Sequence, residues 1–219
     1  MKSEPYAPAK HDAALKARYR RILRFASSAL AELWWFELAL PQIGLAKLGA
    51  RGRVRRLTRL ARNFHDLAAD LGGLMVKVGQ FLSSRFDVLP ESVTRELSGL
   101  QDEVAPQPFH LIQQAIEAEL GMAIDVAFAD INQEPIAAAS LGQAYRATLS
   151  AGLAAELGYQ NVIIKVLRPG IEEIVDVDLK ALRKVGGWLA RVKLVSRRTD
   201  APALVEEFAM TTLEEVNYL

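Results

Sequence analysis

The hydrophobic spacing of this chain changes from helical to strand-like at Gly121, and this change most limits the folds it can adopt. Before it, from about Asp12 onward, apolar residues recur at intervals of three and four, which indicates amphipathic helices. After it, segments rich in β-branched and aromatic residues predict short strands at 125–131, 143–149 and 161–167. Helical spacing then returns at 171–195 and 201–218. The sequence therefore predicts an α+β fold, with an all-helical N-terminal extension followed by a short antiparallel sheet and helices.

Composition excludes several classes of site. The 219 residues contain no cysteine, which rules out disulfides, thiolate nucleophiles and zinc–thiolate centres. The three histidines, His11, His65 and His110, stand in no ligand-spaced motif, so no metal site is expected from them. The polar segment Met1–Tyr6 lacks the apolar core of a secretion signal, and nothing indicates export.

Charge is distributed unevenly along the chain. Residues 1–70 hold 14 Lys/Arg against 6 Asp/Glu, a net charge of +8, whereas residues 71–219 hold 13 against 20, a net charge of −7. A basic arm of this kind suits an anionic membrane surface or a nucleic acid, and a solvated helix face gives the same pattern. No nucleic-acid-reading motif accompanies the arginines of residues 51–62, so a nucleic-acid partner is not expected.

An aromatic segment, Ala29–Leu40, follows the arginines at 18, 20, 21 and 24. Glu32, Glu37 and Pro41 interrupt it, so it falls short of the roughly 18 apolar residues of a bilayer span. Trp34 and its aromatic neighbours could lie at a membrane interface or pack on a neighbouring helix, and the sequence leaves both open.

Lys77-Val-Gly-Gln80 lies in the most distinctive helix. The residues at 71, 74, 75, 78 and 82 predict its buried face, and Lys77, Gln80 and Ser84 form a polar stripe. Such a stripe either reaches into a site or faces water. Pro90 predicts the start of the next helix, and a further helix is expected from Pro108 to Leu120.

Lys165 lies in the apolar segment Val162–Leu167, which we expect to be buried on both faces of the sheet. An ammonium group there needs a phosphate or carboxylate partner, unless the side chain extends to solvent from an edge strand.

Three segments in order give this chain a family resemblance: Lys77–Pro90, Pro135–Gln143 and Val162–Gly170. Over about residues 50–218 the chain resembles the UbiB/AarF family of atypical kinase-like proteins. The resemblance implies a partial kinase-like small lobe in which Lys165 contacts nucleotide phosphates. In place of a glycine-rich loop, it implies that the phosphates are lined by Ala137, Ala138, Ala139 and Ser140.

The same resemblance implies that Lys77 and Gln80 belong to a helical extension folded across the active site. There the lysine would occupy the space of a peptide substrate, which favours ATPase or small-molecule phosphotransfer. Its implied partner is a Glu-x-Asp motif, matched here by Glu215-Val-Asn217 with asparagine in place of the aspartate.

Charge and resemblance together predict three domains: a basic helical arm at 1–70 from the charge count, and, from the resemblance, a helical extension at 71–120 and a small lobe at 121–219. The expected cofactors are ATP or ADP with Mg²⁺, whose ligands would lie beyond residue 219 together with the catalytic loop. We therefore expect an N-terminal fragment without turnover, in the cytoplasm and peripheral on the inner face of the membrane.

The expected partners are a nucleotide and either an anionic membrane surface, which suits the basic arm, or an isoprenoid lipid, because the resemblance implies a link to ubiquinone or isoprenoid-lipid metabolism. The alternative is a non-catalytic helical adaptor that binds a membrane or a partner protein. The phosphoryl acceptor and the oligomeric state stay open.

Overall fold

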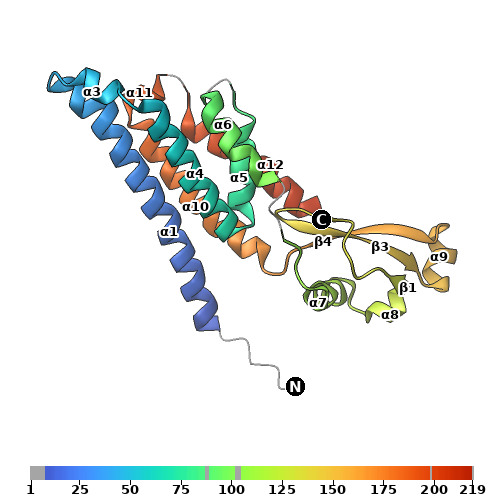
Figure 1. Ribbon diagram of the computed structural model, residues 1–219. Helices are drawn as coiled ribbons and strands as arrows, with labels where there is room; N and C mark the ends of the chain where they lie inside the picture. The colour runs from blue at the N-terminus through green and yellow to red at the C-terminus, as the bar shows by residue number, and fades with distance from the viewer. Residues whose placement is uncertain (1–7, 87–88, 102–104, 198, 219) are drawn as a thin grey trace. The chain divides into compact units, whose positions relative to one another are not determined.

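The computed structural model describes residues 8–86, 89–101, 105–197 and 199–218. It divides the chain into two compact units, each built from two segments. The helical unit comprises Met1–Asp102 and Glu173–Thr211, and the sheet unit comprises Glu103–Glu172 and Thr212–Leu219. Helices dominate and a short antiparallel sheet follows, which confirms the predicted α+β class (Figure 1).

The helical unit is built from helices of very different length. Its first part contains α1 (Pro8–Trp34), the π-helix η1 (Trp35–Ala39), α2 (Leu40–Gln42), α3 (Ala46–Ala50), α4 (Arg53–Leu71), α5 (Leu74–Ser83), α6 (Glu91–Ser98) and the 3-10 turn η2 (Gly99–Gln101). Its second part contains most of α10 (Ile171–Ala190), α11 (Lys193–Ser196) and the first half of α12 (Ala201–Tyr218). None of the described helices is both long and apolar enough to cross a bilayer.

The turn between α4 and α5 depends on two glycines. Gly72 and Gly73 adopt φ values of 63° and 56°, which residues with a Cβ adopt only at a cost. They reverse the chain so that α4, α5 and α6 pack on one another. Leu74, Met75 and Val78 are buried, as the helical spacing predicts, and Leu100 of η2, which contacts α5, is buried as well.

The sheet unit contains α7 (Phe109–Leu120), α8 (Ile124–Ala127), α9 (Ala151–Leu157) and four strands. The strands are β1 (Phe128–Ile131), β2 (Ala137–Ala138), β3 (Gly142–Leu149) and β4 (Asn161–Leu167). β3 is central: β1 and β2 pair with it, and β4 pairs with it along seven residues, all antiparallel.

The predicted strands agree with β3 and β4 almost residue for residue. β1 begins three residues later than predicted because Ile124–Ala127 forms a helical turn. The connection between β3 and β4 contains α9, which ends at Gly158 with φ of 80°. Gly121, with φ of 65°, ends α7 as predicted.

One face of the sheet carries the core of its unit. Tyr145, Ala147 and Leu149 of β3 pack with Ile112 and Ile116 of α7. Partly buried side chains at 162, 164 and 166 of β4 join this cluster. Successive strand residues point to opposite faces, so the intervening residues of β3 and β4 lie on the other face.

Candidate functional site

A row of three residues crosses the sheet on the face away from the core. Ala137 of β2 is opposite Ala144 of β3, and Ala144 is opposite Lys165 of β4. Directly opposed residues on antiparallel strands point to the same face. The sheet register therefore places the start of the alanine segment and Lys165 on one face, separated by the small side chain of Ala144.

Lys165 is exposed, and this corrects one expectation. Burial alternates along β4, and Ile163, two residues earlier on the same face as Lys165, is 65% exposed. The prediction that this strand is buried on both faces is wrong, because the core of the sheet unit covers only the face of Val162, Ile164 and Val166. The ammonium group consequently needs no buried partner to satisfy it.

The four alanine-segment residues differ in their surroundings. Ala137 and Ala138 form β2, a strand that the sequence did not predict, and Ala139 to Leu141 make the turn into β3. Ala139 donates its backbone N–H to the carbonyl of Gly142 at 2.8 Å. Ala137 and Ala139 are exposed, Ala138 is half-buried and Ser140 is buried. The segment is a tight hairpin and not an open glycine-type loop.

Arg168, which the sequence did not single out, holds this turn. Its Nε donates to the carbonyl of Ala139 at 3.0 Å, and its Nη2 donates to the carbonyl of Ala105 at 2.9 Å. Burial lowers the pKa of the Arg168 guanidinium from its usual value. The residue stands directly after β4, so the strand that carries Lys165 also fixes the turn that carries Ala139.

Gln143 fixes the same hairpin from the core face. It is buried, its Oε1 accepts the backbone N–H of Gln107, and its Nε2 donates to the hydroxyl of Tyr145. Tyr145 in turn packs edge-on against Phe109, with 5.6 Å between ring centroids, and burial raises the pKa of the Tyr145 hydroxyl. A glutamine within a strand that is otherwise apolar on its core face is the signal that could have identified this residue.

In the helical unit, Lys77 and Gln80 line one groove between α5 and α12. Its other lining residues are Phe81, Glu207, Phe208 and Thr211, and its volume is about 280 Å³. Lys77 and Gln80 are half-buried, and Ser84 of the predicted stripe is exposed. The polar stripe therefore reaches a groove through its first two residues.

The geometry explains the glycine between Lys77 and Gln80. A Cβ on Gly79 would lie 2.1 Å from Cδ1 of Leu100, so α5 can approach η2 only without one. Gln80 then donates its Nε2 to the carbonyl of Leu100 at 3.3 Å. The motif Lys77-Val-Gly-Gln80 therefore allows α5 to pack closely against η2 and also contributes two lining residues to the groove.

Glu215 lies on α12 eight residues after Glu207 and four after Thr211, on the same stripe of that helix. It belongs to the sheet unit, as does Lys165, whereas Lys77 and Gln80 belong to the helical unit. The pairing of Lys77 with Glu215, and any site shared by Lys77 and Lys165, therefore stay predictions.

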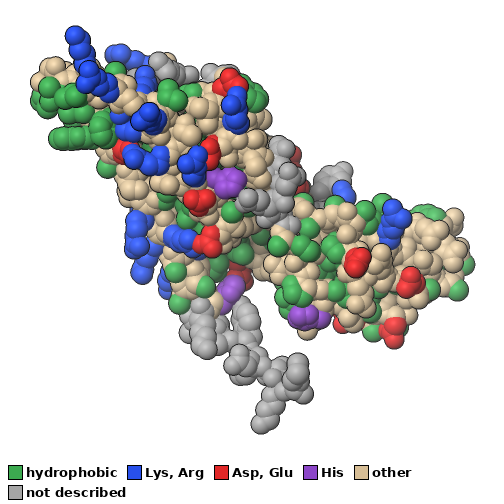
Figure 2. Space-filling view, viewed as in Figure 1, with side chains coloured by type: hydrophobic (Ala, Val, Ile, Leu, Met, Phe, Trp, Pro, Cys, Tyr) green, Lys and Arg blue, Asp and Glu red, His purple; other side chains and the backbone are tan. Residues whose placement is uncertain are grey.

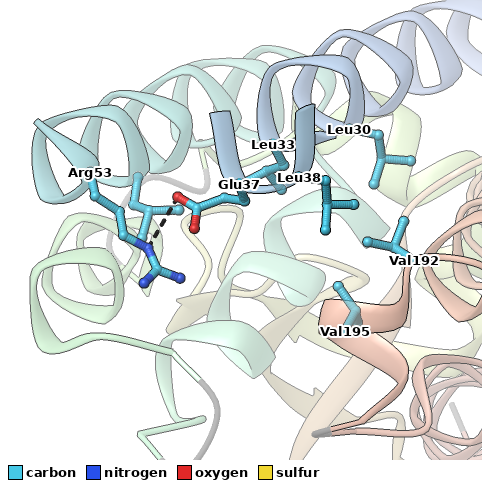
Figure 3. A pocket seen from close by; sticks show the side chains of 8 residues that line it. Leu30, Leu33, Glu37, Leu38, Arg53, Val192 and Val195 are labelled. Carbon is cyan, nitrogen blue, oxygen red and sulfur yellow. Dashed lines mark ion pairs between the residues drawn. The ribbon is translucent and has the colours of Figure 1, made fainter. Parts of the chain in front are cut away.

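A second hollow in the helical unit has a different character. Leu30, Leu33, Leu38, Leu57, Val192 and Val195 line it, and an ion pair of 3.1 Å between Arg53 and Glu37 lies beside them (Figure 3). At about 90 Å³ it is far below the roughly 300–1,000 Å³ typical of small-molecule sites. Across the described ranges, no three His, Asp or Glu side chains are grouped so that they could hold a metal ion.

Comparison with known proteins gives consistent names. The chain is 35% identical over 189 residues to "Probable protein kinase UbiB" of Pseudomonas paraeruginosa, covering 85% of this chain and 33% of that protein. It is 37% identical over 168 residues to "Protein ACTIVITY OF BC1 COMPLEX KINASE 8, chloroplastic" of Arabidopsis thaliana, covering 76% of this chain and 21% of that protein.

A solved structure, the complex of Rv3197 with erythromycin from Mycobacterium tuberculosis, is 27% identical over 68% of this chain and 36% of its own, with a TM-score of 0.39. The chain spans between a fifth and a third of the length of the two curated relatives. The family described as the ABC1 atypical kinase-like domain matches residues 99–219. This match spans more than half of the chain, and with the UbiB and ABC1-kinase relatives it shows that the chain belongs to the ABC1 atypical kinase-like family.

Proposed function

We propose that the open face of the sheet binds the phosphates of ATP or ADP. The observation that carries this proposal is the row Ala137, Ala144 and Lys165, which joins a cation to two of the smallest side chains on one exposed face. Small side chains let a ligand approach the strands closely, and a lysine on a sheet strand is the group that kinase small lobes offer to the α- and β-phosphates. Arg146 adds a second cation, as a diagonal neighbour of Lys165 on that face.

The turn would meet the nucleotide differently from a glycine-rich loop. No residue from Ala139 to Gly142 has a positive φ, so the turn forms none of the concave backbone nests that left-handed residues create for anions. The N–H of Ala139 is already used by the carbonyl of Gly142. Phosphate recognition would therefore come mainly from side-chain cations, with the alanine methyl groups shaping the space beside them.

The reaction that we propose is ATP-dependent phosphotransfer or ATP hydrolysis, with Mg²⁺ neutralising the phosphates, in ubiquinone or isoprenoid-lipid metabolism. This rests on membership of the family and on the UbiB name of several relatives. Within this chain, Lys165 and the alanine segment would contribute binding. Lys77, Gln80 and Glu215 would restrict access to the site, and turnover would require the catalytic loop of a complete kinase-like domain.

Thermal protection by nucleotide tests the binding proposal. ADP or ATP should raise the Tm of the chain, and Lys165→Ala should abolish the rise while leaving the Tm without nucleotide unchanged, because the side chain is exposed. Lys193→Ala, which removes an exposed lysine from α11, is the matched control and should keep the full rise. Equal protection of the wild type and Lys165→Ala would refute the role of Lys165. No protection of the wild type would favour the adaptor alternative.

A further inference from the structure

An exposed apolar surface lies where the chain turns from α1 into α4. Six large apolar side chains there, each 41–65% exposed, form what we call the apolar tip: Trp34, Trp35, Ile43, Leu45, Leu48 and Val54. Figure 2 shows hydrophobic side chains projecting, with Lys and Arg beside them, from the end of the helical unit at which α3 lies. A large contiguous apolar patch on a folded protein marks a surface that something else covers.

The tip has a fixed interior of its own, so its exposed residues are held in place. Arg56 lies over the ring of Phe36 at 4.1 Å, donates to the carbonyl of Arg51 at 2.7 Å and also bonds the carbonyl of Gly49. Gly49 lies so close to η1 that an added Cβ would meet the carbonyl oxygen of Phe36 at 2.5 Å. These contacts of Phe36 and Arg56 hold the turns of the tip together, while Trp34 and Trp35 remain exposed to solvent.

The segment that follows Glu37 and completes the tip is basic. No Asp or Glu occurs between Glu37 and Asp66, whereas seven Lys or Arg do. Four of the seven form ion pairs with Glu32, Glu37 or Glu96. The other three, Lys47, Arg51 and Arg55, are exposed and make no ion pair with any residue in the part of the chain that the structure describes.

The arginines of α1, in contrast, are partly used inside the protein. Arg18 is nearly buried against Asp178, and Arg21 pairs with Asp70. The sequence left open whether the aromatic residues that follow these arginines lie at a membrane interface or pack on a neighbouring helix. Arg20 and Arg24 of α1 stay exposed, but the exposed cations Lys47, Arg51 and Arg55 follow the exposed tryptophans in the segment that forms the tip.

We propose that the apolar tip docks on an anionic phospholipid surface, with Trp34, Trp35 and the aliphatic side chains in the interface and Lys47, Arg51 and Arg55 against the headgroups. Indole rings and aliphatic side chains gain by leaving water for the headgroup and acyl boundary, while unpaired cations gain from anionic lipid. A nucleic acid would pair with the cations but leave the six apolar side chains exposed to water. An anionic lipid surface accounts for both the exposed cations and the exposed apolar side chains.

Vesicle sedimentation of the full chain tests the proposal. The chain should partition to vesicles of phosphatidylcholine mixed with phosphatidylglycerol and much less to phosphatidylcholine alone. Neutralising both Arg51 and Arg55 with glutamine should lower partitioning by about 25-fold, since each basic residue near an anionic surface contributes about fivefold. The matched control, Arg20→Gln with Arg24→Gln, removes two exposed charges from α1 and should change partitioning by less than about twofold.

Tryptophan emission supplies an independent readout of depth. In a Trp188→Phe background only Trp34 and Trp35 remain, and their emission should shift to the blue when anionic vesicles are added. Trp35→Ser combined with Leu48→Ser should weaken binding without lowering the Tm, because both side chains are about half exposed.

Three outcomes would overturn the assignment. Equal partitioning to neutral and anionic vesicles would refute the proposed contacts between the cations and the headgroups. An equal loss of partitioning in the α1 control would refute the assignment of the docking surface to the apolar tip. Retention on duplex DNA that the Arg51 and Arg55 variants abolish, without vesicle binding, would assign the cations to nucleic acid.

Discussion

Arg18 and Asp178, 160 residues apart, form the most deeply buried ion pair among the described residues. Nε and Nη2 of Arg18 each donate to a carboxylate oxygen of Asp178 at 2.6 Å, and the aspartate side chain is completely buried. The same guanidinium donates to the carbonyls of Leu71 and Gly72 at 2.6 and 3.1 Å. Arg18 therefore links α1 and α10 to the turn between α4 and α5. Lys77 lies on α5, directly after this turn.

Loss of Arg18 should be more damaging than loss of the charge on Asp178. Arg18→Ala leaves a buried carboxylate and two backbone carbonyls without their donor, and we expect the free energy of unfolding to fall by about 3–5 kcal/mol. Asp178→Asn removes the charge and keeps the shape, so its cost should be smaller. Urea denaturation measures both, with Arg20→Ala as an exposed control. If Arg18→Ala lowered the free energy of unfolding no more than Arg20→Ala does, the ion pair between Arg18 and Asp178 would not stabilise the fold.

The same carboxylate gives the stability a pH dependence. Burial raises the pKa of Asp178 above its unfolded value, and the hydrogen bonds from Arg18 oppose part of that rise. The folded state then binds the proton more tightly than the unfolded state. This contribution is fully present below the unfolded pKa of about 3.9 and is lost as pH rises through the raised pKa. The pH profile of Asp178→Asn should lack that fall, and identical profiles would contradict the assignment.

Gly79→Ala should disrupt the contact between α5 and η2. The added methyl would lie 2.1 Å from Leu100, and overpacking of this kind costs about 1–3 kcal/mol. Gly187→Ala is the matched control, because it is also a helical glycine and has nothing within 4 Å, so it should be neutral or stabilising by up to about 1 kcal/mol. Combining Gly79→Ala with Leu100→Ala should cost less than the sum of the single changes. Strict additivity in this cycle would show that the two residues do not collide.

Arg168→Lys should loosen the alanine turn, since one ammonium cannot reproduce the two separated donors that meet Ala139 and Ala105. We expect a loss of about 1.5–3 kcal/mol in the stability of the sheet unit, in line with hydrogen bonds from a charged donor. Hydrogen exchange should show faster exchange at the amide of Ala139, which bonds the carbonyl of Gly142. An unchanged exchange rate at this amide would show that Arg168 does not stabilise the turn.

Glu117 should make the sheet unit less stable in acid. Its carboxylate accepts hydrogen bonds from Nε2 of Gln113 at 2.9 Å and from the backbone N–H of Ile124 at 3.2 Å, and these bonds lower its pKa. A lowered pKa gives a contribution that is present above the unfolded value of about 4.3 and disappears as pH falls through the folded value. NMR titration should report a low pKa for Glu117, and Gln113→Ala should raise it. A titration at the unperturbed value would rule out the interaction.

The local pattern was sufficient for much of the fold. The bounds of β3 and β4, the end of α7 at Gly121 and the buried face of α5 depend on near neighbours, through strand propensity, glycine conformation and helical spacing. The motif order also led to the correct family. These features lie within ranges of about 20 residues, over which the amino-acid order determines which side chains share a face.

Long-range partners were decided by the tertiary structure. No local pattern shows that Arg18 meets Asp178, that Gln143 bonds the backbone of Gln107, or that Arg168 reaches Ala105 and Ala139. The sequence determined which residues could form helices and strands and which segments carry the family motifs. Only the folded chain decided that one face of β4 stays open and that two tryptophans stay outside, because burial depends on how much neighbouring surface is available to cover each face.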